Sequence, residues 1–235
     1  MEYKTHCEFG LVFGAGAVIV AQNVGVIPSD ITGDFAALAK TVAMSGIIIW
    51  TAKLGSSYPD LDHPKAYVTN KNIIGKLLHI CIRLTGPKFS KHRSRFTHSY
   101  DATLVTFGII ALVLKGLLAG AIYAGDGYSI ESRFFELLNS VLPIFMLALI
   151  TGVWSHVFAD SLTTEGSYLS MFCKNRFSFV PGNLEIMGAK PLESTFKTNS
   201  PWEHLMYLLS KGVFYVFLGI IVIQTFRSIF IDLLL

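Results

Sequence analysis

A histidine and an aspartate four residues apart, His156 and Asp160, form a pair that could hold a metal ion. If the apolar run before them is helical, both side chains project from one face, about one turn apart. An imidazole nitrogen and a carboxylate at this spacing can share a divalent cation, or the carboxylate can bridge two. A surface histidine beside a helix cap would show the same spacing, so the metal interpretation needs further ligands. The polar run 161–165 and Gly166 should end the helix.

A second group of potential ligands lies in the box Pro59-Asp60-Leu61-Asp62-His63-Pro64. It places two carboxylates and an imidazole within four residues, between prolines that exclude a regular helix. On its own, the box could equally be an ordinary Asp/Pro turn.

A third group contains His92 and His98, which lie among lysines and arginines in the stretch 88–99. A polybasic patch of this kind binds anionic lipid heads beside a membrane span. That role requires no histidine, so His92 and His98 remain candidate metal ligands. His79, in a predicted amphipathic helix over 72–84, is expected to be a packed residue instead.

Composition predicts that membrane-spanning helices position these groups. Of the 235 residues 52% are hydrophobic and only 15% are charged, and the mean hydropathy is +0.53, values that favour a membrane protein. We expect an all-α, polytopic fold with four to five transmembrane helices over 9–27, 35–52, 103–124, 134–154 and part of 204–235. The three cysteines show no C-x-x-C spacing, which argues against a disulfide framework or a zinc knuckle.

Counting spans brings the separate groups to one face of the membrane. If the first span begins on side A, the second returns there, and the fourth ends there. The potential ligands on side A are His6, Asp60, Asp62, His63, His92, His98, His156 and Asp160. Most of the 19 lysines and arginines also fall on side A, so the positive-inside rule predicts that the site faces the cytoplasm.

Histidine and aspartate without paired cysteines suit zinc, manganese or iron, and ligands from several helix ends suggest more than one ion. Metal-bound water ionises near neutral pH and can serve as a nucleophile. Arg93 and Arg95 could contact an anionic oxygen of the substrate, and Asp60 or Asp101 could act as general base. Phosphoester hydrolysis fits this combination best.

Two other functions use the same residues differently. A metal transporter or sensor would place ionisable groups at mid-membrane, whereas the sequence puts them at span ends. A structural membrane protein with a polybasic face would need none of the histidines.

The motifs resemble those of the YdjM-type family of inner-membrane metal-dependent hydrolases. The family pattern has a histidine before the first span, a P-D-x-D-H-P box, an H-R-G-x-T-H-S box, and S-H-x-x-x-D followed by T and G. The matching residues, in order, are His6, the box at 59–64, His92-Arg93 with Thr97-His98-Ser99, and Ser155-His156 with Asp160, Thr163 and Gly166. The stretch between His92 and His98 is one residue longer than the family form and lacks its glycine. The resemblance covers residues 5–181, and 182–235 would add a polar loop and the last span.

The resemblance implies a single membrane-embedded domain over 1–235 in the bacterial inner membrane. The family is similar at motif level to zinc-dependent phospholipase C and related nucleases, which suggests a phosphoester substrate, either a lipid or another anionic molecule beside the membrane. Asp60 and Arg93 are then the predicted catalytic residues, and zinc is the favoured ion. The lipid bilayer is the expected partner, and no nucleic acid is expected.

Overall fold

In the computed structural model of this chain, the described residues are 3–31, 34–63, 94–124, 130–163, 167–172 and 200–227, with isolated positions at 66, 69, 73, 76, 79, 80 and 231. They form helices α1 (Tyr3–Asn23), α2 (Phe35–Gly55), α5 (Tyr100–Ala124), α6 (Ile130–Ser161) and α7 (Pro201–Thr225), and the short 3-10 helix η1 (Pro59–Asp62). Within this described part, five helices are long and apolar enough to cross a membrane. The predicted all-α, polytopic fold is confirmed.

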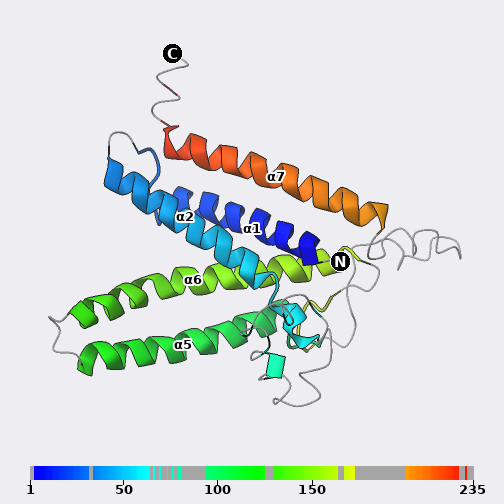
Figure 1. Ribbon diagram of the computed structural model, residues 1–235, viewed down its shortest axis with the longest axis horizontal. Coiled ribbons are helices and arrows are strands. Elements are labelled where there is room, and N and C mark those ends of the chain that lie inside the picture. Colours follow the sequence, from blue (N-terminus) through cyan, green and yellow to red (C-terminus); the bar gives the residue numbers. More distant parts are fainter. Residues whose placement is uncertain are drawn as a thin grey trace, which may run out of the picture.

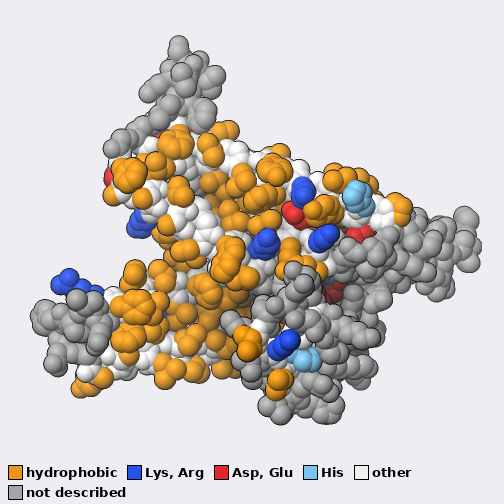
Figure 2. Space-filling model, viewed as in Figure 1, with side chains coloured by type: hydrophobic (Ala, Val, Ile, Leu, Met, Phe, Trp, Pro, Cys, Tyr) orange, Lys and Arg blue, Asp and Glu red, His pale blue; other side chains and the backbone are white. Residues whose placement is uncertain are grey.

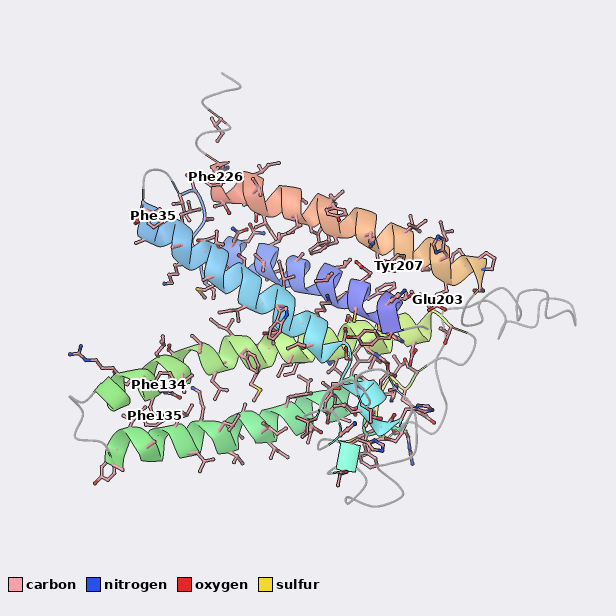
Figure 3. All side chains as sticks on the ribbon, in the orientation of Figure 1. Phe35, Phe134, Phe135, Glu203, Tyr207 and Phe226 are labelled. Atoms are coloured by element: carbon pink, nitrogen blue, oxygen red, sulfur yellow. The ribbon has the colours of Figure 1, made fainter. Side chains whose placement is uncertain are left out.

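The helices run in alternating directions, so their ends gather at two sides of the molecule (Figure 1). α1 packs against α2, α6 and α7, and α5 packs against α6. The start of α1, the end of α2, the start of α5, the end of α6 and the start of α7 share one side, here called the cluster end. Phe35 and Phe226 lie at the opposite side, the far end, whereas Glu203 lies at the cluster end (Figure 3).

Apolar side chains cover the outside of the helices (Figure 2). On α5 and α7, for example, Leu112 is 73% exposed and Val216 is 61% exposed. Water would disfavour so much apolar surface, whereas the hydrocarbon of a bilayer accepts it. The helices are therefore membrane spans with lipid-facing surfaces.

The helices differ from the predicted apolar spans by several residues at most of their ends, and two ends concern the site. α1 begins at Tyr3 rather than at residue 9, so His6 lies inside the first span and not before it. α6 ends at Ser161, where the polar run 161–165 was predicted to end the helix, seven residues beyond the apolar span 134–154. Hydropathy excludes these terminal turns because they are polar, yet Thr5, His6 and Asp160 are buried by tertiary contacts. The last helix is α7, which ends at Thr225. Most of the predicted helix at 72–84 lies outside the described residues, but Ile73, Lys76, His79 and Ile80 are helical.

Glycines let α2 contact the backbones of α1 and α6. A Cβ added at Gly152 would collide with the carbonyl oxygen of Ala52, and one added at Gly14 would lie 2.9 Å from the Ala52 Cβ. Small residues at helix crossings are the usual means of close packing in membranes. This close contact places the end of α2 directly beside the end of α6.

We predict that Gly152→Ala destabilises the protein by about 1–3 kcal/mol, because the new methyl group overpacks the α2–α6 crossing. Gly116→Ala on α5 is the matched control, since a Cβ there meets nothing within 4 Å, and the loss of glycine flexibility should raise stability by about 0.5–1 kcal/mol. Thermal unfolding in detergent measures both. Equal midpoints for the two variants would contradict the packing described here.

Candidate metal centre

Separate elements bring five potential ligands together at the cluster end. His6 comes from the first turn of α1, Asp60 from η1, and His98 from the loop before α5. His156 and Asp160 lie in the last turns of α6, four residues apart on one face, as predicted. We call these five residues the His/Asp cluster. The side chains of His98, His156 and Asp160 are 1% exposed, whereas Asp60 is 21% exposed. The cluster is thus buried, with Asp60 at its accessible edge.

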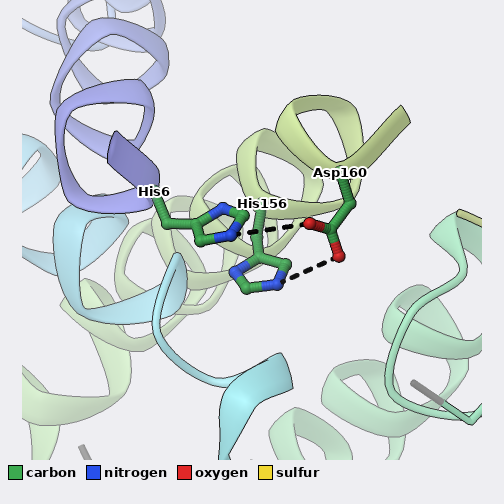
Figure 4. A group of neighbouring side chains, drawn as sticks. All are labelled: His6, His156 and Asp160. Carbon is green, nitrogen blue, oxygen red and sulfur yellow. Dashed lines mark ion pairs between the residues drawn. The ribbon is translucent and has the colours of Figure 1, made fainter. Parts of the chain in front are cut away.

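The ring nitrogens and carboxylate oxygens of the cluster converge. The His156 Nε2 lies 3.6 Å from Asp160 Oδ2 and 3.8 Å from Asp60 Oδ1. The His98 Nε2 is 3.8 Å from the same Asp160 Oδ2. The His6 Nε2 is 3.5 Å from the other oxygen, Asp160 Oδ1 (Figure 4). Two groups of potential metal ligands result, which share His156: His6, His156 and Asp160, and Asp60, His98 and His156.

These separations suit a shared cation better than direct hydrogen bonds. A charge-assisted N–H···O bond has a length of about 2.7–2.9 Å, and the four distances within the cluster are 3.5–3.8 Å. Ligands bound tetrahedrally to one zinc ion at about 2.0–2.1 Å lie roughly 3.3 Å from each other. The donor set, imidazole and carboxylate without sulfur, is typical of zinc, manganese and iron sites. The residues therefore fit the predicted ion.

A backbone carbonyl orients His156. The His156 Nδ1 lies 2.6 Å from the carbonyl oxygen of Ser56, at the end of α2. A carbonyl only accepts hydrogen bonds, so Nδ1 carries the proton and the lone pair of a neutral ring is on Nε2. That lone pair faces Asp60 and Asp160, as metal-binding histidines require.

A hydroxyl group orients His98 in the same way. Thr97 Oγ1 donates its single proton to Asp62 Oδ2 at 2.8 Å and lies 2.8 Å from His98 Nδ1. With its proton used, the hydroxyl must accept from Nδ1–H. A weaker contact from Thr97 to the Ser94 carbonyl, at 3.3 Å, competes for the same proton. The shorter bond to a carboxylate prevails, and the Nε2 lone pair of His98 faces the cluster.

The imidazole of His6 stacks on that of His156. The rings of His6 and His156 are 3.7 Å apart and 11° from parallel. Two imidazolium rings would repel each other at this distance, so the stack favours at least one neutral ring. Because Asp160 presents a different oxygen to each ring, it could connect two ions.

The other residues predicted for the site lie either outside the two groups of potential ligands or outside the described residues. Asp62 is buried and lies 3.7 Å from His98 Nδ1, but it belongs to neither ligand group among the described residues. The same holds for His63, whose backbone N–H donates to the Asp60 carbonyl and closes η1. His92 and Arg93 lie outside the described residues.

His79 and Asp101 form hydrogen bonds that support the segments around the cluster. His79 is buried, and its Nδ1 lies 2.6 Å from the Leu61 carbonyl, so it packs under η1 as expected. Asp101, considered above as a base, accepts hydrogen bonds from the side chains of Ser99 and Ser170 and from the backbone of Ala102 and Met171. It therefore connects the start of α5 to the segment 167–172.

Sequence reasoning missed the roles of Ser56 and Thr97. Thr97 stood inside a recognised motif, next to His98, so its position was a signal for an orienting role. Ser56 acts through its backbone carbonyl, for which no side-chain pattern exists.

The fold and the site define the class of this molecule: a polytopic helical membrane protein with a buried His/Asp cluster that could hold a metal ion. The model of a family described as YdjM inner membrane protein matches residues 1–228. The chain belongs to this family, which confirms the resemblance seen in the motifs and extends it past residue 181, through α7. No curated protein and no solved structure matches the chain.

We predict that Thr97→Val weakens metal binding by about 10–100-fold, because the change removes the hydroxyl that fixes the His98 tautomer. Thr103→Val is the control, since Thr103 Oγ1 donates only to the Ser99 carbonyl of its own segment. Zinc titration of the two purified proteins against a competing chelator measures the effect. Equal affinities would show that Thr97 does not orient His98.

Proposed function

We propose that this chain is a membrane-bound, metal-dependent hydrolase that cleaves a phosphoester at the membrane surface. The observation that supports this most strongly is the convergence of the His98 and His156 Nε2 atoms with the Asp60 and Asp160 carboxylates. Their spacing fits a common divalent ion, and they lie at the ends of spans, where a water molecule and a polar substrate can arrive.

The residues that would hold the ion are His6, His98, His156, Asp60 and Asp160, with zinc favoured and manganese or iron as alternatives. A bound divalent ion supplies an ionised water at neutral pH and polarises a phosphoryl oxygen. Asp60 is the most exposed carboxylate of the cluster, and we assign it the role of accepting a proton from the attacking water. Arg93 is assigned to the substrate's anionic oxygens.

We further propose that the cluster end faces the cytoplasm of a bacterial inner membrane. α1 and α5 end at the far end, and α2 and α6 begin there, and the sequences that connect them, 24–34 and 125–129, contain no lysine or arginine. The segments that join α2 to α5 and α6 to α7 begin and end at the cluster end and contain most of the basic residues. Segments rich in lysine and arginine stay on the cytoplasmic side of a membrane. This asymmetry therefore supports the proposed orientation.

A metal transporter or sensor is the alternative function. Transport sites lie near mid-membrane, between broken helices. The cluster lies instead in the first turn of α1 and the last turns of α6, a placement that favours hydrolysis.

We expect detergent-purified protein to contain zinc, manganese or iron at close to one ion per chain or more, and the double variant His156→Ala/Asp160→Ala to lose most of it. The control is His204→Ala, because His204 belongs to neither group of potential ligands among the described residues and its exposed ring stacks on Tyr207 in α7. Elemental analysis by mass spectrometry measures the content, and gel filtration checks folding. Equal trace metal in all samples would contradict the site. Bound metal without hydrolysis of any phosphoester would favour the transporter or sensor.

The orientation predicts a labelling pattern for cysteines placed in a background without native cysteines. Ser29→Cys, exposed in the loop at the far end, should react with an impermeant maleimide on intact cells. Leu169→Cys, 52% exposed near the cluster end, should react only after the membrane is opened. The reverse pattern would place the cluster outside the cytoplasm.

A further inference from the structure

A second feature of the molecule is an apolar groove between α2 and the α5–α6 pair. It has a volume of about 540 Å³ and is lined by residues that include Met44, Ile47, Trp50, Leu114, Leu118 and Val141. Among the described residues that line it, Thr51 and Trp50 alone have a nitrogen or oxygen atom in the side chain. α2 and α6 lie close together at the cluster end and diverge toward the far end (Figure 1), and apolar side chains line the notch between them (Figure 2).

The groove starts at the depth of the acyl chains of one leaflet and extends past the middle of the bilayer. Thr51 precedes Ser56, which contacts His156, by five residues, or about 8 Å of helix. On the opposite wall, Phe145 precedes His156 by eleven residues, or about 16 Å, and Leu138 precedes it by eighteen residues, or about 27 Å. Half the hydrocarbon thickness of a bilayer is about 15 Å. A lipid whose head group lies at the cluster would therefore place its chain beside the part of these walls that is nearest the cluster.

We propose that this groove binds an acyl chain of a phospholipid, and that the phosphoester cleaved at the His/Asp cluster belongs to that lipid. The second part rests on the proposed function. The walls offer dispersion contacts and almost no hydrogen bonds, which suits a hydrocarbon chain. The groove opens sideways between spans, so a lipid enters it without leaving the bilayer.

The volume of the groove is that of a ligand-sized cavity. A single hydrocarbon chain is narrow enough to enter, and the volume lies within the range of roughly 300–1,000 Å³ that ligand pockets show.

The test compares Val141→Trp, which fills the groove, with Val113→Trp, on an outer face of α5 that is 56% exposed and outside the groove lining. Each protein is reconstituted with phosphatidylglycerol that carries a photoreactive diazirine in one acyl chain. We expect crosslinks on 44–51 and 138–145 in the wild type and in Val113→Trp, and at least about a tenfold loss of them in Val141→Trp. Equal crosslinking of these segments in all three proteins would overturn the acyl-chain site.

Activity tests the lipid substrate separately. The measured quantity is the ratio of hydrolysis rates on dioleoyl- and dibutyryl-phosphatidylglycerol. Val141→Trp should lower this ratio at least about tenfold, because only the long chain reaches the groove, and Val113→Trp should leave it within about twofold. An unchanged ratio in both variants would overturn the lipid substrate. Crosslinks in the groove of a protein that hydrolyses no phosphoester would refute the proposed function while the acyl-chain site stands.

Discussion

The backbone contact between α2 and α6 is the constraint on which the cluster depends. Gly152 lies against the Ala52 carbonyl, and Gly55 lies against the carbonyl of Leu149, so no side chain separates the two helices. This closeness brings the Ser56 carbonyl to the Nδ1 of His156. The bond fixes the ring and directs its Nε2 toward the carboxylates. A larger residue at the crossing would move the imidazole of His156. Both groups of potential ligands would then lose this residue, because each includes it.

The cost of burying charge is the physical reason for proposing a cation at the cluster. Asp160 is almost fully buried among three imidazoles, and a buried carboxylate is stable only when a cation or several hydrogen bonds compensate it. A divalent ion would provide that compensation and join four chain segments at once. Ion binding to the folded state would then also stabilise the fold.

Much of this arrangement could be predicted from the sequence, because connectivity decides on which side each span ends. Span counting placed His6, Asp60, His98 and His156 on one face, and the structure brings them together there. The extent of α1 was wrong, because hydropathy cannot recognise a polar turn that tertiary contacts bury. Within the box at 59–64, the pattern could not separate Asp60 from His63, because a short 3-10 turn directs neighbouring side chains differently. The contact between Ser56 and His156 joins residues 100 positions apart through a carbonyl, which leaves no sequence signal.

X-ray absorption at the metal edge of the purified protein tests the central claim most directly, since it reports the ligands themselves. We predict a shell of nitrogen and oxygen atoms at about 2.0–2.1 Å, with imidazole scattering from histidine and no sulfur. A shell that contains sulfur at about 2.3 Å, which would implicate a cysteine such as the buried Cys7, would contradict it. So would a metal spectrum identical in the wild type and the His156→Ala/Asp160→Ala variant.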